Sequence, residues 1–350
     1  MKGALLLMRI DLVFPVLPPV LNGIGDYTER LARALSAKGC TVRILTAQEH
    51  CEVEGEVEVE QAFSMDAWFG SFSLLDAVRA APPDFLILQY EQFAYGRYGW
   101  NPALPMALRS IKKKNSATGI ATMFHEDFVP ITGWKNAVMT TWQRGQFLAL
   151  GRLSDVVGFS VQPWVRQYES WFPRTEVAHW PVGSNIPEAG ISRSAAREQF
   201  GLDESTFVVG TFGSLRAGKL KSWICESVRA LGQRRDDVLL FHVGPGGEAL
   251  REAAPDLDVF DAGVRPPEEV SSGFSAMDIQ LAPFVDGAST RRGSFLAGLQ
   301  HGVPTVSTRG ALTDSIVLEQ DGNACTLTPV DDKAAFRRAV LDLAARPEER

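Results

Sequence analysis

Nearly continuous apolar runs constrain the fold of this chain more than any other feature. Four of them, each six residues long, are FLILQY at 85–90, GIATMF at 119–124, FVVGTF at 207–212 and VLLFHV at 238–243. A strand that is apolar throughout has both faces buried, as in parallel sheets covered by helices on two sides. Amphipathic stretches such as Tyr27–Lys38 lie between the runs. The pattern predicts an α/β protein with doubly wound parallel sheets.

This alternation occurs twice, once on each side of a turn-rich segment at 183–187. A length of 350 residues suits two domains, and we place them at 1–182 and 188–350, each a Rossmann-like sheet. Ligands of such sheets bind outside the carboxyl ends of the strands, so we expect the two domains to face each other across a cleft. Further strands are expected at 3–10, 41–46, 52–60, 259–260, 277–282 and 304–307, and further helices at 223–234 and 334–344.

Composition excludes several other classes of protein. The net charge of -7 argues against general nucleic-acid binding, because such domains usually carry a basic surface. The four cysteines are far apart and form no CxxC motif, so neither a zinc site nor a disulfide framework is expected. The apolar stretch Met1–Met8 is too short to span a bilayer and is better explained as a buried first strand. We expect a cytoplasmic protein without a metal, and peripheral contact with the inner face of a membrane stays open.

Two segments at strand ends in the first half carry groups suited to a sugar or a phosphate. Gly23 and Gly25 follow the first strand, where glycines let the backbone approach a ligand closely, and Asp26 can cap the next helix. His125 follows a strand and suits proton transfer or hydrogen bonding to a sugar. An ordinary loop and a structural histidine are the alternatives. The residues expected to line the acceptor or sugar pocket are Asp26, Tyr90, Glu126 and Asp127.

Cations and glycines follow the strand at 207–212 in the second half. Ser214, Arg216 and Lys219 lie in this loop, and a diphosphate suits them because arginine binds phosphate as a fork and lysine as a point charge. Backbone groups of a tight segment further on are candidates for bonds to a nucleobase, and they belong to Val264 and Arg265. The alternative is that the cations are ordinary surface residues, which contribute little.

The stretch that begins at Ser289 poses an electrostatic conflict. Ser289 or Thr290 is expected to cap a helix, which would put Arg291, Arg292 and Gly293 in its first turn. The helix dipole favours anions at that end, so two arginines cost stability unless negative charge lies nearby. A phosphate or diphosphate at the helix N-terminus would remove the conflict. Two solvated arginines on a surface helix are the alternative.

The order of these motifs resembles that of GT-B glycosyltransferases, in particular the large retaining group called family 4. The resemblance runs from about Met1 to about Leu343. It rests on NGIGDYTERLARAL near the start, FHED after a strand, PVGSNIP at the linker, FGSLRAGK, FDAGVRPPEEV and DGASTRRGSFLAGLQHGVPTVST. It implies two facing Rossmann-like domains, transfer of a sugar with retained configuration, and no metal requirement.

The resemblance also implies roles for individual residues. His125 would line the sugar pocket, while Arg216 and Lys219 would bind the diphosphate, and we take these three as the catalytic groups. With the phosphate hypothesis above, the expected donor-binding residues are Gly23, Gly25, Ser214, Val264, Arg265, Ser289, Thr290, Arg291, Arg292 and Gly293.

The chain departs from the family pattern in two places. The family commonly carries an ExGxxxxxE-type motif whose second glutamate holds the ribose, and the two glutamate positions here are Ser289 and Ala297. Asp286 is a candidate partial substitute. The chain also ends soon after the helix expected at 334–344, where family members usually have a further helix.

We therefore expect a metal-independent, retaining glycosyltransferase that needs no cofactor beyond its donor, a UDP- or GDP-linked sugar. The acceptor is a sugar, a lipid-linked compound or another small molecule, and its specificity is expected in loops at 93–101 and 131–144. A nucleotide-sugar epimerase and a catalytically degenerate scaffold of the same fold are the alternatives. The scaffold is motivated by Ser289 and Ala297.

Overall fold

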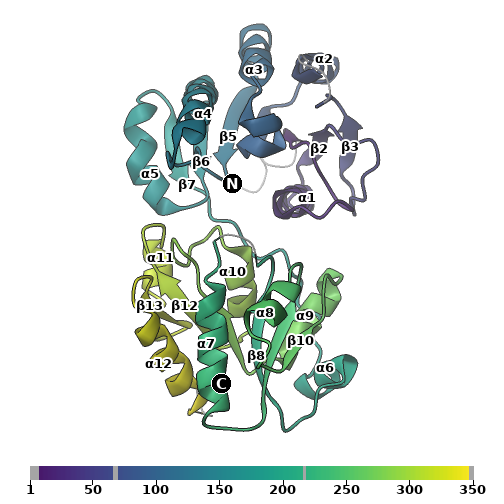
Figure 1. The fold of residues 1–350 in the computed structure, drawn as a ribbon. Coiled ribbons are helices and arrows are strands. Elements are labelled where there is room, and N and C mark those ends of the chain that lie inside the picture. Colours follow the sequence, from purple (N-terminus) through teal and green to yellow (C-terminus); the bar gives the residue numbers. More distant parts are fainter. Residues whose placement is uncertain (1–7, 66–69, 216–217, 347–350) are drawn as a thin grey trace. The chain divides into compact units, whose positions relative to one another are not determined.

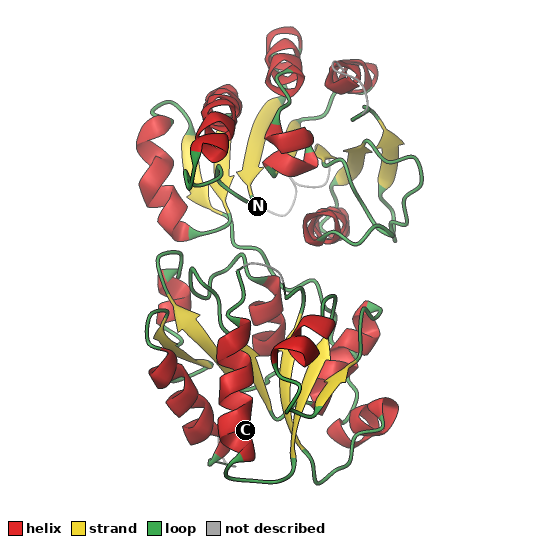
Figure 2. Ribbon diagram, viewed as in Figure 1, coloured by secondary structure: helices red, strands yellow, loops and turns green. Residues whose placement is uncertain are grey.

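The computed structural model describes residues 8–65, 70–215 and 218–346. The chain divides into two compact units, Met1–Pro181 and Val182–Arg350, named here the N-terminal unit and the C-terminal unit. Each unit is a parallel sheet with helices on both faces (Figure 1, Figure 2). The predicted doubly wound α/β architecture is therefore confirmed for both units.

The N-terminal unit has a seven-stranded sheet in the order β3-β2-β1-β4-β5-β6-β7, with all neighbours parallel. Its strands are β1 (Arg9–Val13), β2 (Thr41–Thr46), β3 (Glu58–Gln61), β4 (Phe85–Tyr90), β5 (Gly119–Phe124), β6 (Val156–Phe159) and β7 (Glu176–His179). Its α-helices are α1 (Gly23–Ala37), α2 (Ser73–Ala80), α3 (Ala103–Lys114), α4 (Trp134–Leu153) and α5 (Gln162–Tyr168). Short 3-10 helices include η2 (Gln92–Ala94) and η3 (Arg97–Gly99). The order of strands reverses between β1 and β4.

The C-terminal unit has a six-stranded parallel sheet in the order β10-β9-β8-β11-β12-β13, which reverses between β8 and β11. Its strands are β8 (Phe207–Phe212), β9 (Val238–Val243), β10 (Val259–Asp261), β11 (Ile279–Ala282), β12 (Thr305–Arg309) and β13 (Cys325–Pro329). Its helices are α6 (Arg193–Phe200), α7 (Lys221–Gly232), α8 (Glu248–Ala253), α9 (Pro267–Ala276), α10 (Gly293–Gln300), α11 (Ser315–Leu318) and α12 (Lys333–Ala344).

A buried carboxylate ties the sheet of the C-terminal unit to a helix. Asp278, just before β11, accepts hydrogen bonds from Arg193 at 2.6 Å and from Arg197 at 2.9 Å, both on α6. It also accepts from the backbone N–H of Val208 in β8 at 2.7 Å. The Arg197 side chain is fully buried. Arg197 and Asp278 are both removed from water, so removal of either one would leave an unpaired charge inside the protein.

Five predicted strands have the bounds that the structure gives them: β2, β4, β5, β8 and β9. The first strand was expected at 3–10, but β1 is Arg9–Val13, and residues 1–7 lie outside the described ranges. α1 starts earlier than expected because the side chain of Asn22 accepts hydrogen bonds from the backbone N–H groups of Ile24 and Gly25, which caps the helix at this point.

The predicted loop at 131–144 is wrong, because α4 begins at Trp134 and continues for 20 residues. This helix is hard to recognise in the sequence because polar residues lie on its buried face and apolar residues lie on its exposed face. Thr140, Gln143 and Gln146 are buried, whereas Trp134 is 75% exposed and Val138 is 53% exposed. A helix whose buried face is polar does not show the apolar stripe by which helices are recognised in a sequence. Within the described ranges, no helix has the length and apolar character needed to cross a bilayer.

Candidate active site

The loops after β8 and β11 flank the point where the strand order of the C-terminal unit reverses, which is where ligands of such sheets bind. We name residues 218–220 and 283–292 of these loops the switch loops. They are hydrogen-bonded to each other: Leu220 N–H donates to the Pro283 carbonyl at 3.1 Å, and Val285 N–H donates to the Gly218 carbonyl at 3.0 Å. The two loops therefore form one backbone platform at the carboxyl edge of the sheet.

Lys219 lies in the first switch loop with its ammonium group turned inward. The ammonium group donates to the carbonyl of Phe212, the last residue of β8, and the backbone of Lys219 bridges to Phe284. Burial, together with the charge of Arg292, lowers the pKa of Lys219 to about 7. An amine with a pKa near neutral pH becomes more fully protonated when an anion binds beside it. Arg216, which we expected to act with Lys219, lies outside the described residues.

A single carboxylate holds both arginines of the second switch loop. An Nη of Arg291 lies 2.5 Å from a carboxylate oxygen of Asp286, and an Nη of Arg292 lies 2.5 and 2.6 Å from its two oxygens. The guanidinium of Arg292 also lies over the ring of Phe284, with Cζ 4.7 Å from the centroid. Burial would raise the pKa of Asp286, but the two arginines outweigh it and hold that pKa below its ordinary value. The chain itself therefore relieves part of the electrostatic conflict.

The predicted cap of the following helix is wrong. α10 begins at Gly293 with Arg292 in the capping position, and no side chain caps it, so both arginines precede the helix. Thr290 is used differently: its N–H and its hydroxyl donate to a carboxylate oxygen of Asp314 at 2.6 and 2.8 Å. Ser289 is fully buried, and its hydroxyl has no hydrogen-bond partner within the described part of the chain.

The two positions where the family pattern has glutamates lie inside the fold. Ser289 is buried as described, and Ala297 belongs to an apolar cluster with Phe274 and Val303. Asp286, the candidate substitute, has both oxygens engaged by the arginines. None of these positions therefore offers an uncommitted carboxylate to a ribose.

The remaining predicted donor residues lie on exposed loops of the C-terminal unit. Ser214 is exposed and follows β8. Val264, 56% exposed, and Arg265 follow β10, two strands away from β8 in the sheet. Arg265 Nε donates to the Ala262 carbonyl at 2.7 Å, which fixes the turn around Gly263.

The reversal point of the N-terminal unit lies between β1 and β4, next to the start of α1. A Cβ at Gly25 would lie 2.5 Å from the carbonyl oxygen of Val16, so only glycine fits there. A Cβ at Gly23 would meet nothing within 4 Å. Burial, partly opposed by Arg30, raises the pKa of Asp26 to about 6. Gly25 therefore allows the start of α1 to pack closely against the backbone at Val16, whereas the space beside Gly23 is open.

His125 lies directly after β5 and is only 6% exposed. Its Nε2 lies 2.7 Å from Oε1 of Gln89 in β4, and the ring of Tyr27 from α1 packs against it with the centroids 5.3 Å apart. Burial lowers the pKa of His125 to about 3, so the imidazole is neutral at physiological pH. A neutral imidazole is suited to hydrogen bonding with a sugar hydroxyl, and less to carrying charge.

The other residues predicted near the sugar differ in their exposure. Tyr90 is buried, with its ring stacked on Tyr95 at 5.7 Å and its hydroxyl accepting a hydrogen bond from Gln146 at 3.4 Å. Asp127 accepts a hydrogen bond from the hydroxyl of Tyr168 at 2.9 Å. Glu126, between His125 and Asp127, is half-buried. Among the described residues, no group of three or more His, Cys, Asp or Glu side chains is arranged to hold a metal ion.

Gln89 is a site residue that the sequence interpretation missed. Its side chain is fully buried against His125, although 36 positions separate the two residues in the chain. The available signal was a polar side chain inside the otherwise apolar run FLILQ. Buried polar groups are usually hydrogen-bonded, so such a residue predicts a partner but does not identify it.

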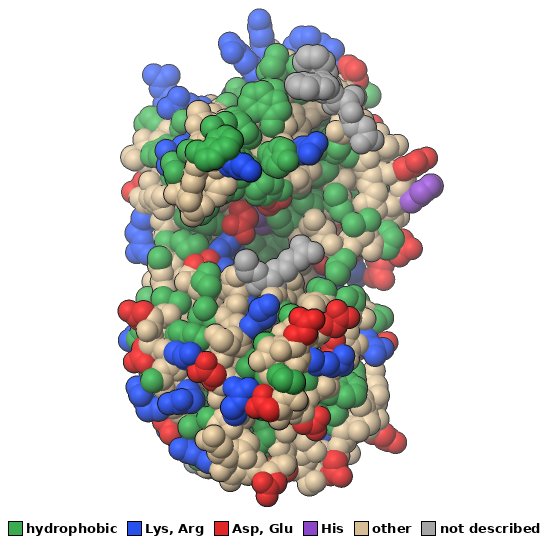
Figure 3. Space-filling model, viewed as in Figure 1, with side chains coloured by type: hydrophobic (Ala, Val, Ile, Leu, Met, Phe, Trp, Pro, Cys, Tyr) green, Lys and Arg blue, Asp and Glu red, His purple; other side chains and the backbone are tan. Residues whose placement is uncertain are grey.

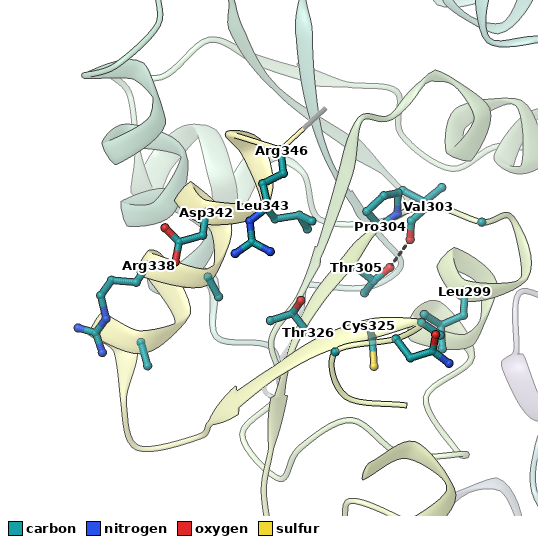
Figure 4. A pocket seen from close by; sticks show the side chains of 16 residues that line it. Leu299, Val303, Pro304, Thr305, Cys325, Thr326, Arg338, Asp342, Leu343 and Arg346 are labelled. Atoms are coloured by element: carbon teal, nitrogen blue, oxygen red, sulfur yellow. Dashed lines mark hydrogen bonds between the residues drawn. The ribbon is translucent and has the colours of Figure 1, made fainter. Parts of the chain in front are cut away.

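A separate cavity of about 850 Å³ lies at the other edge of the C-terminal sheet (Figure 4). Its walls come from the amino ends of β12 and β13, around Thr305 and Cys325, and from α12, including Arg338 and Asp342. The hydroxyl of Thr305 donates to the Val303 carbonyl at its wall. Because the switch loops follow the carboxyl ends of the strands, this cavity does not belong to the candidate active site.

Known proteins resemble this chain in the sequence of its C-terminal unit and in its fold. Residues 206–346 match the family model described as glycosyl transferases group 1. Among solved structures, the chain is similar to sucrose-phosphate synthase from Thermosynechococcus elongatus, with 14% identity and a TM-score of 0.72 over 98% of this chain and 91% of that one. A search of curated proteins returns no significant match.

Two further structures share the fold. WaaG, a glycosyltransferase involved in lipopolysaccharide biosynthesis, is 15% identical with a TM-score of 0.71 over 97% of this chain and 92% of that one. Anabaena HepE, solved in complex with UDP-glucose, is 14% identical with a TM-score of 0.64 over 98% of this chain and 91% of that one. The C-terminal unit therefore matches the group 1 glycosyltransferases, a family of retaining, nucleotide-sugar-dependent enzymes, and the chain shares the GT-B fold of these structures over nearly its full length.

Proposed function

We propose that the switch loops bind the diphosphate of a nucleotide sugar and that this sugar is transferred to an acceptor held by the N-terminal unit. The observation that carries the proposal is that three basic residues gather around Phe284. Lys219 bridges to its backbone, Arg292 lies over its ring, and Arg291 shares Asp286 with Arg292. Cations gathered at the carboxyl edge of a sheet, where its strand order reverses, suit an anionic ligand.

The same groups would act on the chemical step. Negative charge builds up on the leaving nucleotide diphosphate as the sugar–oxygen bond breaks, and donors already fixed in place stabilise such charge without reorganisation. The N-terminus of α10 adds backbone N–H groups directed toward an anion. His125 would hydrogen-bond the sugar that is transferred. We propose a UDP- or GDP-linked donor, and the UDP-glucose complex of HepE supports the first.

Calorimetric titration with UDP, GDP and ADP tests the diphosphate site. We expect at least one to bind, and Arg216→Ala and Lys219→Ala each to weaken that binding by about 1.5–3 kcal/mol, as for hydrogen bonds to charged groups. Arg338→Ala is the matched control, because this exposed arginine lines the cavity at the opposite edge of the sheet. If none of the three nucleotides binds, the catalytically degenerate scaffold becomes the better explanation.

For the acceptor side, we propose that the N-terminal unit works at an anionic membrane surface. The exposed face at the start of α4 carries Trp134 and Val138, with Ile131 61% exposed just before it. Tyr98 and Trp100 of the adjoining segment are exposed as well, and Trp142 Nε1 donates to the Tyr98 carbonyl at 3.0 Å. Aromatic rings exposed beside cations are typical of proteins that lie in the headgroup region of a bilayer.

Basic and acidic residues of the N-terminal unit lie in different segments, which suits binding of its basic segment to an anionic membrane. Residues 92–153 contain eight Lys or Arg and two Asp or Glu, whereas residues 47–60 contain six Glu and no Lys or Arg. Figure 3 shows hydrophobic side chains gathered on the visible face of the N-terminal unit, in the area of α3 and α4, with Lys and Arg side chains around them. Each Lys or Arg near an anionic surface contributes about 1 kcal/mol of attraction.

Co-sedimentation with vesicles tests the membrane contact. We expect binding to phosphatidylglycerol vesicles that weakens in high salt, little binding to phosphatidylcholine vesicles, and an at least tenfold loss in the double variant Trp134→Ala, Val138→Ser. Ile316→Ser is the control, since Ile316 is similarly exposed, at 54%, but lies on the C-terminal unit. Equal binding by the double variant and the control would exclude this surface as the membrane contact.

A further inference from the structure

Among the residues that the structure describes, the imidazole of His125 has one hydrogen-bond partner, the side chain of Gln89. Gln89 belongs to β4 and His125 follows the neighbouring strand β5, so the parallel pairing of the two strands places them side by side. The Nε2–Oε1 distance is 2.7 Å, Gln89 is fully buried and His125 nearly so. The hydrogen bond of the His125 ring is made by Nε2, and Nδ1 makes none within the described residues. The ring of Tyr27 packs edge-on against the imidazole with an interplanar angle of 74°.

This contact decides which ring nitrogen carries the proton. An amide oxygen only accepts, so the hydrogen bond requires the proton on Nε2 and leaves a lone pair on Nδ1. The titratable groups on the elements around the ring are Asp26, Tyr27, Glu29, Arg30 and Arg33 of α1, Tyr90 of β4 with Glu91 after it, and Glu126 and Asp127 of its own loop. None of them shifts the pKa of His125, which is lowered by burial. His125 therefore stays neutral, with Nδ1 as an acceptor.

Packing alone would not favour glutamine at this position. The side-chain nitrogen of Gln89 is buried and has no hydrogen-bond partner among the described residues, which is unfavourable for an amide. Methionine would fill a similar volume with no buried amide group. The favourable side-chain hydrogen bond that remains is the one to His125, so the chemistry of this residue is explained by the imidazole that it contacts.

We propose that Gln89 is a positioning residue for His125: its Oε1 fixes the ring and holds the proton on Nε2, which presents Nδ1 to a hydroxyl of the transferred sugar. The proposal rests on the sugar-binding role proposed for His125. Gln89 acts through the histidine and does not contact the substrate. In metal sites and catalytic triads, too, the tautomer of a histidine is set by a hydrogen bond to the ring nitrogen that does not take part in the chemistry.

Nitrogen-15 NMR of the histidine rings tests the proposal on the free, full-length protein. The chain has five histidines, and loss of one signal in His125→Gln assigns the resonances. We expect the wild type to keep the proton on Nε2 between pH 5 and pH 8, as set by an amide acceptor. Gln89→Met should give a mixture of tautomers. Gln89→Glu should keep the tautomer but raise the pKa of His125 by more than about one unit, because a carboxylate stabilises imidazolium. A proton on Nδ1 in the wild type, or an unchanged ring in Gln89→Met, would overturn the proposal.

Activity provides the second measurement, using hydrolysis of whichever of UDP-glucose, GDP-mannose and ADP-glucose the wild type turns over. Gln89→Met should lose about tenfold or more in kcat/KM, with a melting temperature within about 4 °C of the wild type. Gln89→Glu should match the wild type at pH 8.5 and lose roughly tenfold per pH unit below the new pKa, where Nδ1 becomes protonated. A profile in Gln89→Glu that stays flat through the raised pKa measured by NMR would contradict the proposal.

These measurements separate the two hypotheses. If His125→Gln keeps full activity, the sugar-binding role of His125 fails, whereas the NMR result still decides whether Gln89 sets the tautomer. If the tautomer shifts in Gln89→Met and kcat/KM does not change, Gln89 orients the ring with no consequence for transfer, and the positioning role is rejected.

Discussion

Titration of Lys219 offers the most direct test of the diphosphate site. Its pKa is lowered to about 7 in the unliganded protein, first by burial and then by Arg292. A diphosphate bound at the switch loops would stabilise the charged amine and raise this pKa. A group whose pKa rises on binding contributes fully to affinity below its pKa in the free protein. That contribution is lost as the pH rises through this value, so affinity should fall above pH 7.

The size of the effect follows from the protonation equilibrium. With a pKa of about 7, roughly half of the Lys219 side chains are charged at pH 7, and about one in thirty at pH 8.5. If the bound state keeps the amine charged throughout, affinity falls roughly fifteenfold over this range, or about 1.6 kcal/mol. At pH 8 each binding event should take up roughly 0.9 of a proton.

Calorimetry with UDP-glucose measures both quantities, because the charge of its diphosphate diester stays constant over this range. The protons taken up are obtained by titrating at pH 8 in two buffers of different ionisation enthalpy. Lys219→Arg should bind with little dependence on pH, since a guanidinium stays charged. Lys333→Met is the control for removal of a lysine, because Lys333 is exposed and pairs with Glu226 on the surface.

Two results would refute this reasoning. Binding without proton uptake at pH 8 would mean that Lys219 does not change its protonation, and hence that the diphosphate lies elsewhere. Uptake that persists unchanged in Lys219→Arg would assign the proton to a different group.

Two predictions concern the scaffold that holds the site. Asp278→Ala should lower the free energy of unfolding, measured by urea denaturation, by about 3–5 kcal/mol, because it leaves the buried Arg197 unpaired; a loss below about 1 kcal/mol would show that the pair is not buried as described. Gly25→Ala should cost about 1–3 kcal/mol because its Cβ meets the Val16 carbonyl oxygen, whereas Gly23→Ala should be tolerated, and thermal unfolding of the two variants side by side checks this contrast.

At two helices, tertiary contacts produced a structure that the local sequence pattern does not predict. The sequence of α4 places polar residues where a helix normally has its apolar stripe, and those residues are buried because they hydrogen-bond to loops: Gln143 to the Val129 N–H at 2.9 Å and Gln146 to the Gly99 carbonyl at 2.6 Å. The predicted start of α10, with Ser289 or Thr290 as its cap, was wrong for a related reason. Asp314, distant in the sequence, accepts hydrogen bonds from the N–H and the hydroxyl of Thr290 and so fixes this residue ahead of the helix.

The sequence by itself determined the two doubly wound sheets and the bounds of their most apolar strands, because burial on both faces imposes a composition that can be read locally. Which groups meet at the reversal points was decided only by the tertiary structure. Strand order brings Gln89 beside His125, and the joined switch loops bring Lys219 toward Arg292. Such contacts join residues that are far apart in the chain, and no local preference of either residue specifies its partner.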